Sequence, residues 1–412
     1  MNNASMLRKI LVSDFSISVF LHGLKSLVAL AINWMVLAQF PTADYVTWAV
    51  SSSILVVATA SDLGIGQYAA THFIHATSDR WPAIARESIA ALVPLALAAV
   101  VFVYLALGSH PAAYKAAMAA FIGLRILSIP FGAALNAVNQ FKLRKAIEVG
   151  VYLVSALLIG WVAYAGKPVL WALLILNACF MVGGFVTIQF AARYFDLRAL
   201  WASLPNGASV NRVYRDSVPF MVNNLTGLLS YGGFIWVSSL FLPTDALAKL
   251  SILHTFILIN AYQVYDVLLR ARQADLIRIE HVRRISRFNF VLMTGCPLLA
   301  FAFGEPLLSF ITQSMEFSQV EILLFSVFLA IELGFLLIQS VVQVRPQLGS
   351  LLTRYSMVKL TCQAMAIVIF WIAASVTAQS LANYIALLTS TSLLGYVFCH
   401  MHLRTHMRST GG

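Results

Sequence analysis

Long apolar stretches recur along the 412-residue chain, separated by short polar connections. Each stretch holds about 20 mostly apolar residues, which is the length that an α-helix needs to cross a hydrocarbon core of about 30 Å. The pattern therefore predicts an all-α polytopic membrane protein. Its twelve predicted spans are residues 16–39, 46–70, 88–108, 115–138, 148–165, 169–191, 217–241, 247–269, 288–303, 319–342, 356–376 and 382–402.

Composition agrees with this pattern. The chain is 60% hydrophobic and only 10% charged, whereas a soluble domain is about 25% charged, so a soluble fold would lack a polar surface. Four cysteines lie far apart without C-x-x-C spacing, and they predict neither a disulfide framework nor a zinc site. The histidines His400, His402 and His406 near the C-terminus are more typical of an interfacial basic tail than of a metal site. We expect no cofactor and no metal.

Basic residues predict the orientation in the membrane. Of the 27 Lys and Arg residues, 21 lie in the two termini and the connections on their side, 3 lie on the opposite side, and 3 fall within spans. Cytoplasmic loops carry such an excess of Lys and Arg, so both termini are predicted to be cytoplasmic. The same loops account for the net charge of +11 through contact with anionic lipid headgroups, and no nucleic-acid partner is inferred.

The connection at residues 193–217 is the longest hydrophilic break, and it divides the spans six and six. We expect an N-terminal lobe at residues 1–205 and a C-terminal lobe at residues 206–412. A weak internal repeat supports this division, because a shift of 202 places Asp14 on Asp216. Six spans return the chain to the same side, so the lobes would be parallel repeats with a central polar cavity between them.

Polar and charged residues inside the spans mark the candidate site, because a charge at the centre of a membrane helix costs about 2.5 to 3.5 kcal/mol. In span one, His22, Lys25 and Asn33 share one helical face, and in span four Arg125 shares a face with Asn136. Amides can equally act as hydrogen-bonding glue between helices, worth about 0.6 kcal/mol each. The predicted substrate-binding residues are His22, Lys25, Asn33, Arg125, Asn136, Asn223, Asn224, Asn260 and Gln263.

Three acids within or beside spans are candidates for exchange of a coupling ion, namely Asp62, Asp266 and Glu332. Each has a structural alternative, since Asp266 can pair with Arg270 and Asp62 can mark a helix break. Lys359, near the start of span eleven, is predicted to snorkel to the cytoplasmic surface or to pair there.

The stretch SDLGIGQY, residues 61–68, contains the start of the G-x-G-x-x-A spacing of a dinucleotide-binding turn, which Ala69 completes. That spacing has a nucleotide meaning only after a strand and inside a βαβ unit, and here it ends an apolar span. Gly64 and Gly66 are instead predicted to bend a membrane helix or to allow close packing, with Asp62 fixed beside them. Pro130 similarly offers a kink in span four.

A cavity carrying Lys25, Arg125 and several amides suits an anionic, hydroxyl-rich substrate, with cations for phosphate and amides for sugar hydroxyls. The chain also resembles a family. SDLGIGQY, PTADYVTWAV at residues 41–50 and NAVNQFKLRKAIEV at residues 136–149 resemble segments of the O-antigen and polysaccharide repeat-unit flippases, within the multidrug/oligosaccharidyl-lipid/polysaccharide exporter superfamily.

The resemblance implies export of an undecaprenyl-diphosphate-linked oligosaccharide, for O-antigen, capsule or exopolysaccharide, from the cytoplasmic to the periplasmic leaflet of a bacterial inner membrane. It implies alternating access and antiport of H⁺ or Na⁺. Other polysaccharide-assembly proteins are expected as partners. Lys25 and Arg125 would then face the diphosphate.

Two other functions fit the same spans. A multidrug or organic-cation antiporter of this architecture would need acids and aromatic faces in its cavity, and Lys25 and Arg125 argue against it. A membrane glycan polymerase would normally need a substantial outer loop, and the outer connections are short. We therefore expect a transporter and not an enzyme.

Overall fold

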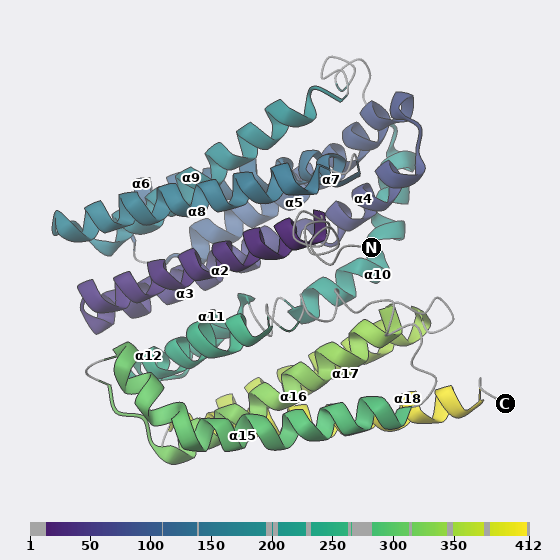
Figure 1. Ribbon diagram of the computed structural model, residues 1–412. Helices are drawn as coiled ribbons and strands as arrows, with labels where there is room; N and C mark the ends of the chain where they lie inside the picture. The colour runs from purple at the N-terminus through teal and green to yellow at the C-terminus, as the bar shows by residue number, and fades with distance from the viewer. Residues whose placement is uncertain are drawn as a thin grey trace, which may run out of the picture. The chain divides into compact units, whose positions relative to one another are not determined.

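The computed structural model describes residues 14–108, 110–137, 140–194, 200, 205–227, 232–262, 265, 282–312, 315–343, 349–374 and 380–409. These ranges are helical and contain no β-strand (Figure 1). Eight of the helices in them are individually long and apolar enough to cross a membrane. The protein is an all-α polytopic membrane protein, as the hydrophobic pattern predicts.

The first half of the chain forms long helices joined by short turns. Spans two and four are each divided in two, so six predicted spans appear as eight helices. These helices are α2 (Asp14–Gln39), α3 (Thr42–Thr59), α4 (Ile65–His75), α5 (Trp81–Ala106), α6 (Ala112–Leu127), α7 (Ile129–Ala137), α8 (Phe141–Tyr164) and α9 (Val169–Ala191), with 3₁₀ turns η1 (Ala60–Asp62) and η2 (Ser78–Arg80).

The second half is helical as well, and it includes a π-helical turn that continues from α12. Its elements are α10 (Gly207–Gly227), α11 (Phe234–Ser238), α12 (Thr244–Ile252), the π-helix η5 (Leu253–Leu258), α15 (Val282–Thr312), α16 (Gln319–Gln343), α17 (Gly349–Ala374) and α18 (Leu381–Ser409).

Packing divides the chain into two compact units. Unit 1 comprises Met1–Phe40 and Val50–Leu225, and unit 2 comprises Pro41–Ala49 and Thr226–Gly412. Helix α3 thus begins in unit 2 and continues into unit 1. The predicted lobes at residues 1–205 and 206–412 follow the internal repeat, and that division stays a prediction.

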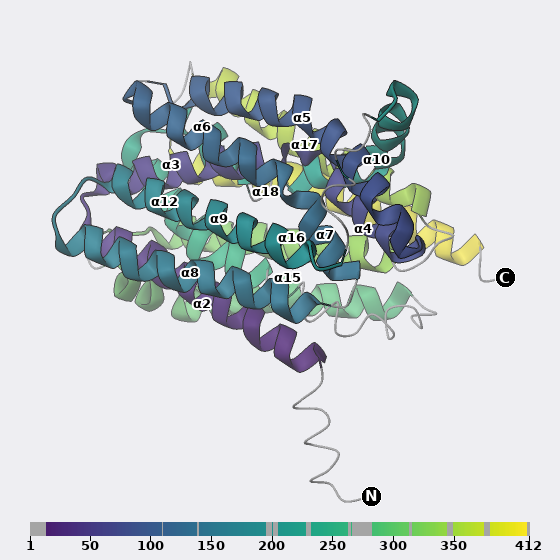
Figure 2. The ribbon, with the colours of Figure 1, turned by 90° about the horizontal axis from the view of Figure 1, so that it is seen from above.

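Within unit 1, α2 packs along α8, α8 along α9, and α9 along α6, so these four helices are successive neighbours (Figure 1, Figure 2). Within unit 2, α16 packs against α15, α17 and α18. Among the described candidate spans, α16 is the most deeply buried. Helix α16 therefore has protein neighbours on several sides.

The predicted bend after Asp62 is confirmed. Leu63 and Gly64 both have left-handed backbone, with φ of +48° and +81°. The Asp62 carboxylate accepts hydrogen bonds from the backbone N–H groups of Gly64 and Gly66, at 3.3 and 3.2 Å. A Cβ on Gly64 would lie 2.5 Å from the Cβ of Phe220 on α10. Glycine is therefore required here both by the backbone and by the close approach of α10.

The predicted kink in span four is confirmed as a break between α6 and α7. The Ser128 hydroxyl donates to the carbonyl of Arg125 at 2.7 Å, and the Phe131 N–H donates to the Ser128 carbonyl at 3.2 Å. Pro130 has no N–H to contribute to a continuous helix. The side chain of Ser128 faces α9, where a Cβ on Gly184 would lie 3.1 Å from its Oγ.

Candidate functional site

A carboxylate on α8, Glu148, lies among three cationic side chains of unit 1. Its Oε2 is 2.9 Å from the Nζ of Lys145 and 3.2 Å from the Nζ of Lys25 on α2, and its Oε1 is 3.4 Å from the Nε of Arg144. Lys145 and Arg144 precede Glu148 by three and four residues, so one helical face brings them together. Lys25 arrives because α2 packs along α8.

Aromatic rings connect this group to Arg125. The Lys25 ammonium lies 5.6 Å from the ring centroid of Tyr152, one turn beyond Glu148 on α8. The Tyr152 ring meets the ring of Phe180 on α9 edge to face, with centroids 5.2 Å apart. The guanidinium of Arg125 lies 4.4 Å from the Phe180 centroid. Two cations from different helices therefore lie on the two rings of one aromatic pair. Such cation–π contacts stabilise a cation more strongly when it is desolvated.

The balance of charge in this cation cluster, which we define as Lys25, Arg125, Arg144, Lys145 and Glu148, is positive. Glu148 supplies one negative charge against four positive ones. The side chains of Lys25, Arg144, Lys145 and Glu148 are between 14% and 36% exposed, so they are accessible to a polar ligand. A cluster of this kind is chemically suited to bind an anion through charge-assisted hydrogen bonds.

Lys25 and Arg125 are linked through the contacting rings of Tyr152 and Phe180, and their membership of one binding site stays a prediction. His22 lies one turn before Lys25 on α2, and its carbonyl accepts a hydrogen bond from Ser26 Oγ at 3.1 Å. Asn136 lies at the end of α7, and its Oδ1 is buried with no hydrogen-bond partner within the described ranges. Whether these residues bind substrate stays a prediction.

Other predicted amides contact their own helices. Asn33 donates to the carbonyl of Ala29 at 2.8 Å. Asn260, in unit 2, donates to the carbonyls of Thr255 and Phe256 at 2.9 and 3.2 Å, and so supports the π-helical turn η5. The side chains of Asn223 and Asn224 and all of Gln263 and Asp266 lie outside the described structure.

Glu332, a predicted ion-coupling acid, is paired inside unit 2. Its Oε2 lies 2.6 Å from the Nζ of Lys359, with the side chains 0% and 3% exposed. Gln363 Nε2 donates to Glu332 Oε1 at 3.4 Å. The prediction that Lys359 snorkels to the cytoplasmic surface is wrong, because its side chain is buried and pairs with the buried Glu332. Ion exchange at Asp62 and Glu332 is not tested by these contacts.

Glu148 was not among the predicted site residues. It is the first residue of the predicted fifth span, although α8 begins earlier, at Phe141. The available sequence signal was the spacing R-K-x-x-E at residues 144–148, which places acid and bases on one helical face. The contact with Lys25 had no local signal.

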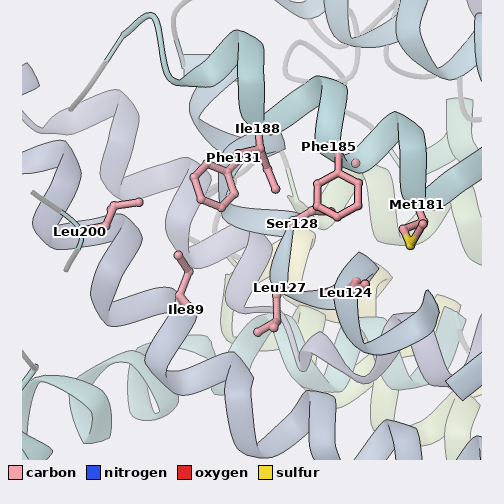
Figure 3. Close-up of a pocket in the computed structure, with 10 residues that line it drawn as sticks. Ile89, Leu124, Leu127, Ser128, Phe131, Met181, Phe185, Ile188 and Leu200 are labelled. Atoms are coloured by element: carbon pink, nitrogen blue, oxygen red, sulfur yellow. The ribbon is translucent and has the colours of Figure 1, made fainter. Parts of the chain in front are cut away.

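A second feature of unit 1 is an apolar groove of about 260 Å³ beside the break between α6 and α7 (Figure 3). Leu124 and Met181 line the groove. The next residue in the chain after Leu124, Arg125, and the one before Met181, Phe180, are not in the lining and make the cation–ring contact described above. The groove and the cation cluster are therefore different sites. The groove is lined by Ile89, Leu124, Leu127, Ser128, Phe131, Met181, Gly184, Phe185, Ile188 and Leu200.

The fold defines a class of multi-pass helical membrane protein, and solved structures share it. No protein-family model and no curated protein matches the chain. An inward-facing multidrug resistance MATE family transporter of the MOP superfamily is similar with a TM-score of 0.66 and 12% identity, covering 97% of this chain and 100% of that one. The lipid II flippase MurJ gives 0.68 and 10%, covering 95% and 87%. The MATE multidrug transporter DinF-BH gives 0.64 and 12%, covering 94% of each chain. At such identities the likeness shows the fold.

Proposed function

We propose that the protein is a flippase that moves an anionic lipid-linked oligosaccharide, of the undecaprenyl-diphosphate class, from the cytoplasmic to the periplasmic leaflet by alternating access. The observation that carries the proposal is the cation cluster, in which three cations surround the Glu148 carboxylate and a fourth, Arg125, lies on the adjoining Phe180 ring. The fold supports a transporter rather than an enzyme, because MATE transporters and the flippase MurJ share it.

The chemistry of the cluster fits a diphosphate. Guanidinium groups bind phosphate oxygens in a bidentate manner, and ammonium groups act as compact point charges. Glu148 provides an internal anion that holds Lys25, Arg144 and Lys145 together when no substrate is bound. An entering diphosphate then competes with one carboxylate for several cations, while the apolar tail stays in the hydrocarbon.

The competing candidate is a multidrug antiporter, and the MATE structures have this same fold. A cationic drug needs carboxylates and open aromatic faces. In the cation cluster the faces of Tyr152 and Phe180 already hold Lys25 and Arg125. The positive balance there favours an anionic substrate.

Ion coupling, a bacterial inner-membrane location with both termini in the cytoplasm, and association with polysaccharide-assembly proteins complete the proposal. The predicted orientation puts the Arg144 end of α8 near the cytoplasmic face, which is the side on which a lipid-linked precursor would be loaded. H⁺ and Na⁺ are both candidates for the coupling ion.

A reconstitution experiment tests the function. Purified protein in liposomes should move a fluorescent diphosphate-linked oligosaccharide lipid between leaflets, and Lys25→Ala combined with Arg125→Ala should abolish this transfer. Lys115→Ala is the matched control, because that lysine is an exposed cation that donates to the Gly108 carbonyl away from the cluster. Ion-driven export of a cationic dye without glycan-lipid transfer would overturn the proposal in favour of a multidrug antiporter.

A further inference from the structure

Unit 2 contains a buried group of three side chains on two neighbouring helices. Glu332 is on α16, and Lys359 and Gln363 lie one turn apart on α17. The carboxylate contacts the ammonium at 2.6 Å and the amide at 3.4 Å. All three residues are buried, and the proposed diphosphate site does not involve them.

The chemistry of these groups is that of a small cation site with the cation already supplied by the chain. Carboxylate and amide oxygens are the ligands that hard cations prefer in proteins. The Lys359 ammonium occupies the position beside the Glu332 carboxylate, and it also lies near the Phe335 ring, 5.3 Å from Nζ to the centroid. An ammonium held between a carboxylate and an aromatic face is well compensated.

The position inside the membrane helices makes the pair persistent. A lone carboxylate or ammonium in a membrane helix is costly, and breaking a buried pair leaves one charge uncompensated. Neither side chain reaches solvent, since they are 0% and 3% exposed. A dissolved ion would have to displace a cation that the chain itself keeps in place.

We propose that Lys359 is a tethered counter-ion that fills a latent monovalent-cation site formed by Glu332 and Gln363. The wild-type protein therefore needs no dissolved cation between α16 and α17, and Glu332 is not the residue that exchanges a coupling ion. Removal of the ammonium leaves the charge of the Glu332 carboxylate without its counter-ion. The Gln363 amide can then turn its oxygen, instead of its NH₂ group, toward a bound cation. The proposed cation site in unit 2 is independent of which substrate the protein transports.

The test is thermal unfolding of the full-length protein in detergent, in sodium chloride and in choline chloride at equal ionic strength. The wild type should unfold at the same temperature in both salts. Lys359→Met should unfold at a lower temperature in choline and recover by about 3 °C or more in saturating sodium, because ligand binding stabilises the folded state. Adding Glu332→Gln to Lys359→Met should remove the sodium response.

A second variant tests the site without breaking the pair. Gln363→Glu keeps Lys359 and adds a second carboxylate, so it should also gain a sodium response. Lys249→Met is the control, because Lys249 pairs with Glu321 at 3.6 Å in a more exposed part of unit 2 and should give no sodium response. The proposal would be overturned if neither Lys359→Met nor Gln363→Glu were stabilised by sodium, or if acid alone restored the stability of Lys359→Met.

Discussion

The ammonium of Lys25 lies 3.2 Å from the carboxylate of Glu148, although 123 residues separate them in the chain. The contact joins α2 to α8, and α8 in turn supplies Arg144 and Lys145 to the same carboxylate. One acid thereby holds together three cations that would otherwise repel one another. The proposed anion site is a product of this pairing.

Glu148→Gln removes the internal anion and leaves its cations uncompensated. We expect the folded protein to lose about 1 kcal/mol of stability, because the groups are partly exposed and screened by solvent. Binding of inorganic diphosphate should become roughly tenfold tighter, since the ligand no longer competes with a carboxylate. Thermal unfolding and calorimetric titration measure the two effects. An unchanged diphosphate affinity would remove Glu148 from the site.

Arg125 should act through its planar guanidinium as well as through its charge. We expect Arg125→Ala to reduce glycan-lipid transfer by about tenfold or more, which is the loss of one charge-assisted contact. Arg125→Lys should recover only part of the activity, because an ammonium cannot stack on Phe180 or bind phosphate in a bidentate manner. Equal activity of the Lys variant and the wild type would reduce the role of Arg125 to charge alone.

Gly64→Ala should strongly destabilise unit 1. The added Cβ meets the Cβ of Phe220 at 2.5 Å and requires a left-handed backbone, so we expect a loss of about 2 to 4 kcal/mol. Gly108→Ala is the matched control, because Gly108 is also left-handed, with φ of +52°, but a Cβ there meets no atom within 4 Å. It should lose about 1 to 2 kcal/mol. Similar melting temperatures for the two variants would show that the approach of α10 is unimportant.

Asp62 is expected to serve as a cap for α4, because it accepts from the N–H groups of Gly64 and Gly66. Asp62→Asn keeps an acceptor and should lose about 0.5 kcal/mol, whereas Asp62→Ala should lose about 1 to 2 kcal/mol. Transfer activity should survive in Asp62→Asn once expression is normalised. Loss of ion-driven transfer in a stably folded Asp62→Asn would instead identify Asp62 as a coupling acid.

Local sequence signals predicted much of the fold. Apolar runs located the spans because each must satisfy its backbone hydrogen bonds within a helix while its side chains face lipid or protein. Gly64 and Pro130 predicted the breaks in spans two and four, since left-handed backbone and a missing N–H are properties of a single residue. Lys25 and Arg125 were conspicuous because a charge inside a span needs compensation.

The sequence by itself therefore determined an all-α membrane protein, the helix breaks in spans two and four, and which charges within spans require partners. Only the tertiary structure decided what those partners are. Glu148 on α8 pairs with Lys25 on α2, and Glu332 on α16 pairs with Lys359 on α17. Such pairs depend on how each helix is rotated about its axis and on where its ends fall. Those quantities are set by packing along whole helices, which no short stretch of sequence contains.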